Sequence, residues 1–362
     1  MLRPAHLDAS LIGQTLPWDL YTESGVLVAA AGLTLADEAQ YLRLIARPLY
    51  RDVAFPVREQ RIGIGVAERL TALAEEAETL LPPPYGVTFH DQVIRLARGL
   101  IELYRVDPEI CLGYGRLAAV SRPVLHHALQ VIYVSLLLAD QLDFDDGELE
   151  RLTAAALTMN IEMLDLYDRI HAQPGRLAEA DREVIRLHPA AAAKTLSEIG
   201  IDDDDWLVAV AQHHECMDGS GYPEGLKAEA ISMPARILHV ADVYCAKLAG
   251  RNYRPQKTPS SAMQELFGID RRRLDEQVAT QLMRRLGLYP PGTLVRLENG
   301  ECACVARHGR GGAVKRVVSF LDAADRLMEP PRPRDLETHA IRGFLLPDPA
   351  WPAVEWARLW EE

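Results

Sequence analysis

The stretch that decides the fold is His213-His214-Glu215-Cys216-Met217-Asp218-Gly219-Ser220-Gly221-Tyr222-Pro223. Its two adjacent histidines are expected at the end of a helix over Trp206–Glu215, and a glycine-rich loop follows them. Imidazole is a common ligand of zinc and iron, so this pair is a candidate for metal binding. An isolated pair of histidines is more often structural, and that alternative stays open on these residues alone.

The sequence around this stretch is almost wholly helical. From about Leu125 to Leu286 apolar residues recur with helical spacing, and the segment Val131–Leu142 is apolar on most of its circumference. We therefore expect that segment to lie at the centre of a helical domain. Two earlier helices are predicted over Val66–Leu81 and Asp91–Tyr104, and the acidic run Asp202–Asp205 is interpreted as a helix start.

Both ends of the chain have short strand patterns instead. Strands are expected within Gln14–Tyr21 and Gly25–Ala31, and further strands at Thr293–Arg296, Ala303–Ala306 and Val314–Phe320. The proline-rich tail beyond Pro330 is predicted to be irregular. These patterns predict a mainly α protein in four parts: a small β-rich N-terminal module at 1–58, a helical packing region at 59–118, a helical domain at 119–288, and a β-rich C-terminal extension and tail at 289–362.

Composition limits the classes of partner. The 362 residues carry a formal net charge of −13, which argues against binding to a nucleic acid polymer. The longest apolar run, near Val131–Ala139, is about half of the roughly 20 residues that a membrane span needs. Five cysteines without a framework spacing, and a start that does not resemble a secretory signal, predict a soluble protein of the reducing cytoplasm.

Taken whole, the stretch His213–Pro223 closely resembles the HHExxDGxGYP signature of the HD-GYP family, with every fixed position kept. The resemblance extends over roughly Asp107–Pro291, and His127, His188 and Asp242 lie in further family segments. It implies a helical bundle of the HD superfamily. Typical members hold two or three ions of iron or manganese and hydrolyse cyclic di-GMP.

The chain departs from the family in three places. Where the resemblance leads us to expect the His-Asp pair and a following lysine, this chain has Met159, Asn160 and Met163. A glutamate found in some three-metal members is Pro123 here, and Cys245 replaces a common aspartate. The chain therefore resembles a degenerate member that lacks the HD pair.

These replacements bear directly on the chemistry. The amide of Asn160 cannot bridge two cations as a carboxylate does, and the thioether of Met159 is a soft ligand poorly matched to Mn²⁺ or Fe²⁺. We therefore assign no catalytic residue and expect little or no hydrolysis. His188, His213 and His214 could still hold one ion of zinc, iron or manganese, and three histidines packed without metal are the alternative. The resemblance places His127 and Asp242 in the remnant of the metal set, and we expect these two side chains to form a hydrogen-bonded pair.

Two further groups are candidates for binding. Arg251 and Arg254 match a basic pair of the family and suit bidentate contact with phosphates, although surface arginines without a role are equally compatible with the sequence. The resemblance assigns the loop a part in shaping the ligand site, through Tyr222 and Pro223, and in docking GGDEF-domain proteins. That loop set comprises Asp218, Gly219, Gly221, Tyr222 and Pro223. A purely structural loop is the alternative.

Three hypotheses for the function follow. The favoured one is a protein of cyclic di-GMP signalling that binds the cyclic dinucleotide, partner proteins or both, with little or no hydrolysis. The second is an active or weakly active metal-dependent phosphodiesterase that uses His188, His213 and His214. The third is a helical adaptor that binds neither metal nor nucleotide.

Overall fold

The computed structural model describes residues 2–4, 12–13, 16, 20–22, 27–29, 33–45, 48–52, 62–118, 120, 122–140, 142–172, 177–250, 256–308 and 312–360. The chain divides into two compact units, residues 1–62 together with residue 362, and residues 63–361. Each unit is considered by itself. The finer boundaries expected near residues 118 and 288 stay predictions.

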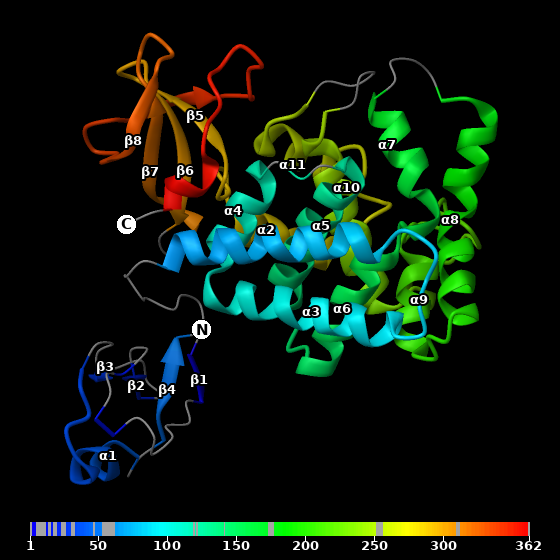
Figure 1. The fold of residues 1–362 in the computed structure, drawn as a ribbon, viewed down its shortest axis with the longest axis horizontal. Helices are drawn as coiled ribbons and strands as arrows, with labels where there is room; N and C mark the ends of the chain where they lie inside the picture. The colour runs from blue at the N-terminus through cyan, green and yellow to red at the C-terminus, as the bar shows by residue number, and fades with distance from the viewer. Residues whose placement is uncertain are drawn as a thin grey trace. The chain divides into compact units, whose positions relative to one another are not determined.

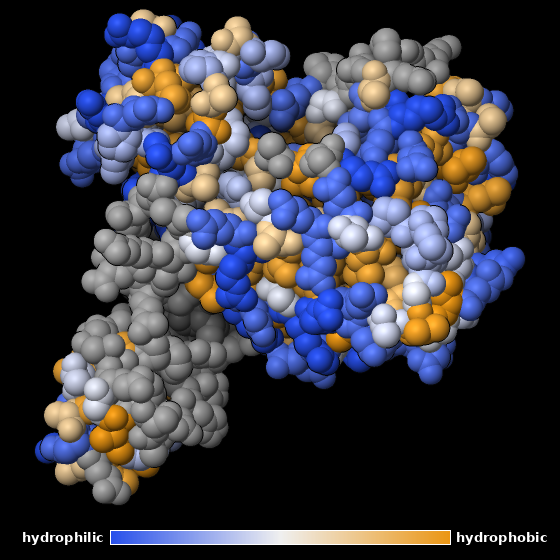
Figure 2. Space-filling view, viewed as in Figure 1, coloured by the Kyte–Doolittle hydropathy of each residue, from blue (hydrophilic) through white to orange (hydrophobic). Residues whose placement is uncertain are grey.

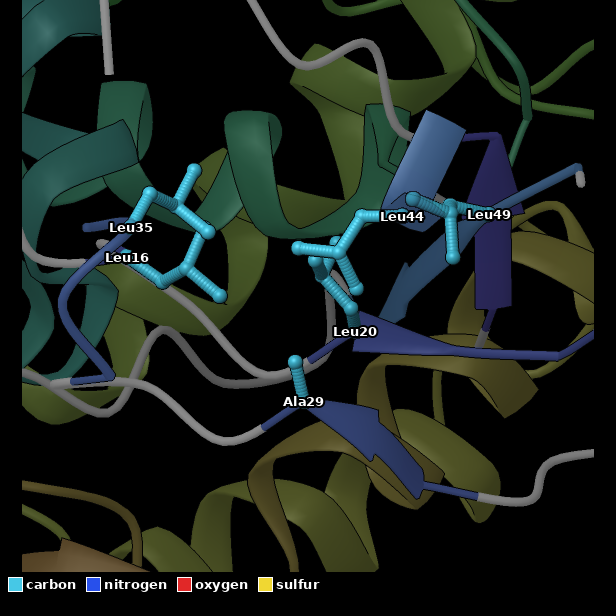
Figure 3. Close-up of a cluster of buried hydrophobic side chains, with 6 residues drawn as sticks. All are labelled: Leu16, Leu20, Ala29, Leu35, Leu44 and Leu49. Carbon is cyan, nitrogen blue, oxygen red and sulfur yellow. The ribbon is translucent and has the colours of Figure 1, made fainter. Parts of the chain in front are cut away.

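The N-terminal unit is a small antiparallel sheet with one helix. Its strands follow the order β1-β4-β2-β3. Leucines gather in its core, where α1 packs beside the strands, and Figure 3 shows the buried cluster Leu16, Leu20, Ala29, Leu35, Leu44 and Leu49. The elements are β1 (Leu2–Pro4), β2 (Leu20–Tyr21), β3 (Leu27–Ala29), α1 (Glu38–Ile45) and β4 (Tyr50–Asp52).

The second unit is built on a helical bundle, as the apolar spacing predicts. Its central helix, α5 (Pro123–Ala139), is buried around most of its circumference and packs against α3, α4, α6, α7, α10 and α12 (Figure 1). The other helices are α2 (Ile62–Leu80), α3 (Phe89–Val106), α4 (Pro108–Leu117), α6 (Asp146–Thr158), the 3-10 turn η2 (Ile161–Met163), α7 (Leu164–Ala172), α8 (Glu179–Glu198), α9 (Asp204–Gln212), η3 (Ala228–Ala230), α10 (Met233–Leu248), α11 (Pro259–Phe267) and α12 (Glu276–Leu286).

Side-chain caps fix where the helices that carry the site begin. Asp203 accepts a hydrogen bond from the backbone N–H of Trp206 at 2.9 Å and caps α9, so the acidic run is a helix start as predicted. Ser232 caps α10 through the N–H of Ala235. The Trp206 indole is fully buried and donates to the Thr158 hydroxyl, which ties α9 to α6.

An antiparallel sheet closes the chain, and part of it corrects the sequence prediction. Its strands follow the order β8-β7-β6-β5-β9. The tail beyond Pro330, predicted to be irregular, supplies half of β8 and all of β9. Prolines are tolerated in β8 because it is an edge strand, where an N–H is not needed on the outer side. The elements are β5 (Leu294–Leu297), β6 (Cys302–His308), β7 (Val314–Leu321), β8 (Leu327–Arg334), β9 (Ile341–Phe344) and the 3-10 turn η5 (Trp356–Trp360).

The face of the bundle that Figure 2 shows is mostly polar. On the face shown in Figure 2, hydrophilic residues dominate and apolar residues form small separate patches, as expected when the apolar sides of the helices face inward. Among the described residues, no helix combines the length and apolar character needed to cross a membrane.

The C-terminal sheet, β5 to β9, and the turn η5 contact α4 through polar and apolar side chains. Arg307 of β6 donates to Asp107, the capping residue of α4, at 2.6 Å. The His308 N–H donates to the carboxylate of Glu109 at 2.8 Å. The buried Trp360 ring lies against Gly113 and donates its indole N–H to the Ala306 carbonyl. The turn η5 is therefore part of the packed structure of this unit.

The close approach of Gly113 to Trp360 gives a stability prediction. A Cβ on Gly113 would overlap the Trp360 ring and lie 3.0 Å from the Gly292 nitrogen, so Gly113→Ala should destabilise the fold by about 1–3 kcal/mol. Gly65→Ala, in α2 with nothing within 4 Å of its Cβ, is the control and should raise stability by up to about 1 kcal/mol. Denaturant unfolding measures both, and equal effects of the two substitutions would contradict the packing seen here.

Glu109 predicts a pH dependence. Burial raises the pKa of its carboxyl from the usual 4.5 to about 7, against the opposing effects of the His308 N–H, Arg307 and Lys315. Between these pH values the folded chain keeps a proton that the unfolded chain releases, so this group's contribution lowers stability as pH rises from about 4.5 to about 7. Glu109→Gln still accepts from His308 and cannot ionise.

We therefore expect the free energy of unfolding of Glu109→Gln to rise by about 1–3 kcal/mol relative to the parent chain as the pH increases across that range. Below and above the range, the plots of unfolding free energy against pH should be parallel for the two proteins. Denaturant unfolding at a series of pH values tests this. The exposed Glu102→Gln is the control and should track the parent chain throughout. Parallel profiles for Glu109→Gln across the whole range would show that the group titrates normally.

Candidate metal centre

Three imidazoles from two parts of the bundle meet at one point. His188 lies on α8, whereas His213 and His214 follow the end of α9. One ring nitrogen from each lies within 4.8 Å of the others, and the Nε2 atoms of His188 and His213 are 3.1 Å apart. His188 and His213 are buried, and the side chain of His214 keeps 18% of its surface exposed. The cluster is therefore a candidate site for a cation with a path to solvent.

Local backbone explains how two of these rings are oriented. His188 Nδ1 lies 2.7 Å from the carbonyl of Ile185, and His213 Nδ1 lies 2.7 Å from the carbonyl of Val210. Pro189 has no N–H, so the helical hydrogen bond that would otherwise occupy the Ile185 carbonyl is missing. Val210 is in the last turn of α9, where carbonyls have no helical partner.

These contacts fix the tautomers. A carbonyl oxygen only accepts, so each Nδ1 must carry the proton, and the facing Nε2 atoms of neutral His188 and His213 both present lone pairs. Burial lowers the pKa of His188 to about 3, with a further contribution from His213, and burial lowers the pKa of His213 to about 4. At neutral pH no proton lies between the two nitrogens, and a cation is the partner that suits them. The donor set fits one metal ion.

His127 and Asp242 form a separate pair at the edge of the cluster. His127 Nε2 and Asp242 Oδ1 are 2.7 Å apart, which matches the hydrogen-bonded pair that we expect from the sequence. The other Asp242 oxygen is 3.9 Å from His214 Nδ1. Burial acts to raise the pKa of Asp242, but the hydrogen bond from His127 and the nearby histidines outweigh it and hold the pKa below its usual value.

The loop after His214 is held by Glu215. Its buried carboxylate accepts from the backbone N–H groups of Glu224, Gly225 and Leu226, at 2.7, 3.2 and 2.9 Å. Gly221 has no room for a Cβ, which would lie 2.6 Å from the His214 carbonyl oxygen and overlap the backbone of Cys216. This tight turn places the centroids of the Tyr222 and His214 rings 4.8 Å apart.

The replaced positions lie at the end of α6. Met159 follows α6 directly and is fully buried, Asn160 precedes η2, and Met163 is the last residue of η2; the last two are also buried. One boundary prediction is wrong: the helix expected over Trp206–Glu215 ends at Gln212, because the chain must turn there to place His213 and His214. Arg251 and Arg254 lie outside the described residues, so their predicted role in phosphate binding stays a prediction.

Two residues of this region were missed by sequence reasoning. In the sequence, Glu215 stands out only as a fixed position of the signature, and that position is the one sign of its structural role. His239 was assigned no role, yet its Nδ1 donates to the His213 carbonyl at 3.0 Å and its Nε2 lies 3.7 Å from the Cys216 sulfur. No local pattern in the sequence signals that contact.

Comparison with known proteins agrees with this architecture. Residues 114–278 match the model of the HD domain family. The chain is 31% identical over 258 residues to "Cyclic di-GMP phosphodiesterase PA4108" of Pseudomonas aeruginosa, covering 70% of this chain and 62% of that protein. It is 33% identical over 159 residues to "Cyclic di-GMP phosphodiesterase response regulator RpfG" of Xanthomonas campestris, covering 42% of this chain and 40% of that protein.

A solved structure, described as Bd1817, a HDG"Y"P protein from Bdellovibrio bacteriovorus, shares the fold with a TM-score of 0.54 at 16% identity, covering 77% of this chain and 98% of that one. The chain thus spans between 40% and 62% of the length of the two curated relatives. The helical architecture, the match over residues 114–278 and these relatives support one conclusion: residues 114–278 form an HD domain that is similar to proteins named cyclic di-GMP phosphodiesterases.

Proposed function

We propose that this chain acts in cyclic di-GMP signalling by binding the cyclic dinucleotide at a one-metal site, with little or no hydrolysis. The observation that carries the proposal is the convergence of the His188, His213 and His214 nitrogens within 4.8 Å, while Asn160 replaces the expected carboxylate. The curated relatives, named cyclic di-GMP phosphodiesterases, supply the substrate class.

His188, His213 and His214 would hold the ion. Nitrogen donors of this kind suit zinc and iron, and manganese less well. When bound, such an ion supplies a Lewis acid that attracts a phosphate oxygen or a water molecule. The protein's own part is to keep the protons on both Nδ1 atoms, which donate to the Ile185 and Val210 carbonyls, so that the Nε2 lone pairs stay directed at the site.

Hydrolysis lacks two features in this chain. A two-ion site needs a carboxylate shared between the cations, and an amide at position 160 cannot supply its charge. Asp242, the other acidic candidate, already accepts a hydrogen bond from His127. Each loss of about 1.36 kcal/mol of transition-state stabilisation lowers the rate tenfold, and several such losses combine in this proposal.

The loop of Asp218, Gly219, Gly221, Tyr222 and Pro223 is the proposed docking surface for GGDEF-domain proteins. The rigidity of the segment that follows this loop supports the proposal, because Glu215 accepts three backbone hydrogen bonds from that segment. A weak phosphodiesterase at the three-histidine site is the second candidate, favoured by the partial exposure of His214.

Metal content tests the site itself. Elemental analysis of the purified chain should find about one ion of zinc, iron or manganese per molecule, as expected for a single three-histidine site. His213→Ala should reduce that content to near zero, and His90→Ala, at an exposed histidine far along the sequence from the cluster, should leave it unchanged. Equal metal loss in both variants, or none in either, would contradict the assignment.

Ligand binding tests the function. Calorimetry should show cyclic di-GMP binding with a Kd at or below about 100 micromolar, corresponding to roughly −5 kcal/mol or stronger. Arg254→Ala should weaken it about tenfold by removing a charged phosphate contact, whereas the exposed Arg332→Ala should not change it. If calorimetry detects no binding at 100 micromolar ligand, the nucleotide is not the ligand of this site, and the hypothesis of a helical adaptor is favoured. Steady release of the linear dinucleotide would instead favour the weak phosphodiesterase.

A further inference from the structure

A second polar feature of the helical unit lies apart from the histidine cluster. Arg116, in the last turn of α4, lines a cavity of about 30 Å³ together with residues of α5, α10 and the start of the C-terminal extension. The remaining lining residues include Cys111, Gln130, Tyr133, Tyr244, Cys245 and Pro290. That volume has room for one or two water molecules or one halide-sized anion.

The Arg116 guanidinium has no carboxylate partner among the residues that the structure describes. Its side-chain hydrogen bond is a long one, from Nη1 to the Thr293 hydroxyl at 3.5 Å. By contrast, neighbouring arginines of the fold are paired: Arg122 with Asp165 and Asp168, and Arg307 with Asp107. Burial lowers the pKa of Arg116, yet a guanidinium stays protonated at neutral pH.

The ionisable groups that act on Arg116 supply no negative charge. They are Tyr244, Cys245 and Cys304, which are neutral at pH 7 by their ordinary pKa values. Burial raises the pKa of Cys304 to about 12 and that of Cys245 well above its usual value, despite the nearby guanidinium. Arg116 is partly buried, and a charge with little access to water and no counter-charge is costly, so this position favours an anion.

A second observation points to a ligand. The Tyr244 hydroxyl is buried and has no hydrogen-bond partner within the described part of the chain, and Tyr244 itself lines the cavity with only 2% of its surface exposed. Buried hydroxyls are normally satisfied. An anion in the cavity would accept from this hydroxyl and from the guanidinium at once.

We propose that a small monovalent anion, chloride being the natural candidate, binds in this cavity against Arg116 and joins α4, α5 and α10 where the C-terminal extension begins. The apolar share of the lining suits a weakly hydrated anion better than a phosphate or a carboxylate metabolite, and the small volume excludes a nucleotide. This site is independent of the proposed function, because it needs neither the metal nor cyclic di-GMP.

Thermal unfolding of the full chain in sodium chloride, against sodium gluconate at the same concentration, gives the first test. Gluconate is too large for the cavity, so chloride should raise Tm saturably, by roughly 3 °C at a tenfold excess over Kd. Arg116→Met should lose this chloride response. Cys245→Asp places a carboxylate beside the guanidinium and should also lose it, while Cys245→Ser, which adds no charge, should retain it.

Bromide provides a direct readout that does not depend on the variants folding. Crystals of the parent chain grown in sodium bromide should show an anomalous peak between Arg116 and Tyr244. Bromide peaks confined to the surface, or a chloride response that is equal in the parent chain, Arg116→Met and Cys245→Asp, would overturn the proposal. Failure of cyclic di-GMP binding would leave it unaffected.

Discussion

The constraint on which the site depends is the fixed proton on two imidazoles. Ile185 and Val210 offer carbonyls that no helical N–H occupies, one because Pro189 follows and the other because α9 ends nearby. Each carbonyl accepts a hydrogen bond from the Nδ1 of a histidine, and the two unprotonated Nε2 atoms then face each other 3.1 Å apart. Helix ends and a proline, placed by the fold, thus create a site that suits a cation. His214 and the turn beyond it complete this site.

The three histidines supply nitrogen ligands, but the residues around them supply little free negative charge. Neutral nitrogens remain, whereas the negative charge that would be shared between two ions is absent at Asn160, and the charge of Asp242 is engaged by His127. In the function that we propose, such a centre would hold one ion and attract a phosphate, with little means of stabilising the second oxygen of a displacement. At Arg116 the ionisable side chains that act on the guanidinium are a phenol and two thiols, and none of them is a carboxylate.

Sequence reasoning predicted the helical core, the central helix, the two β-rich ends and the hydrogen-bonded pair of His127 and Asp242. Apolar periodicity suffices for the helices, and the long signature identifies the histidines. Periodicity failed at helix ends, since α9 stops at Gln212 for reasons of tertiary structure. It also failed in the tail, where edge pairing allows strands rich in proline. Contacts between segments that are apart in the sequence, such as Glu215 with the backbone of Glu224 and His239 with the His213 carbonyl, leave no local pattern.

The most direct test is a crystal structure of the metal-loaded chain with diffraction recorded at the absorption edges of zinc, iron and manganese. The account predicts one anomalous peak, bounded by the imidazoles of His188, His213 and His214, and none beside Asn160. A second peak next to Asn160, at the roughly 3.5–4 Å separation of a two-ion catalytic centre, would contradict it.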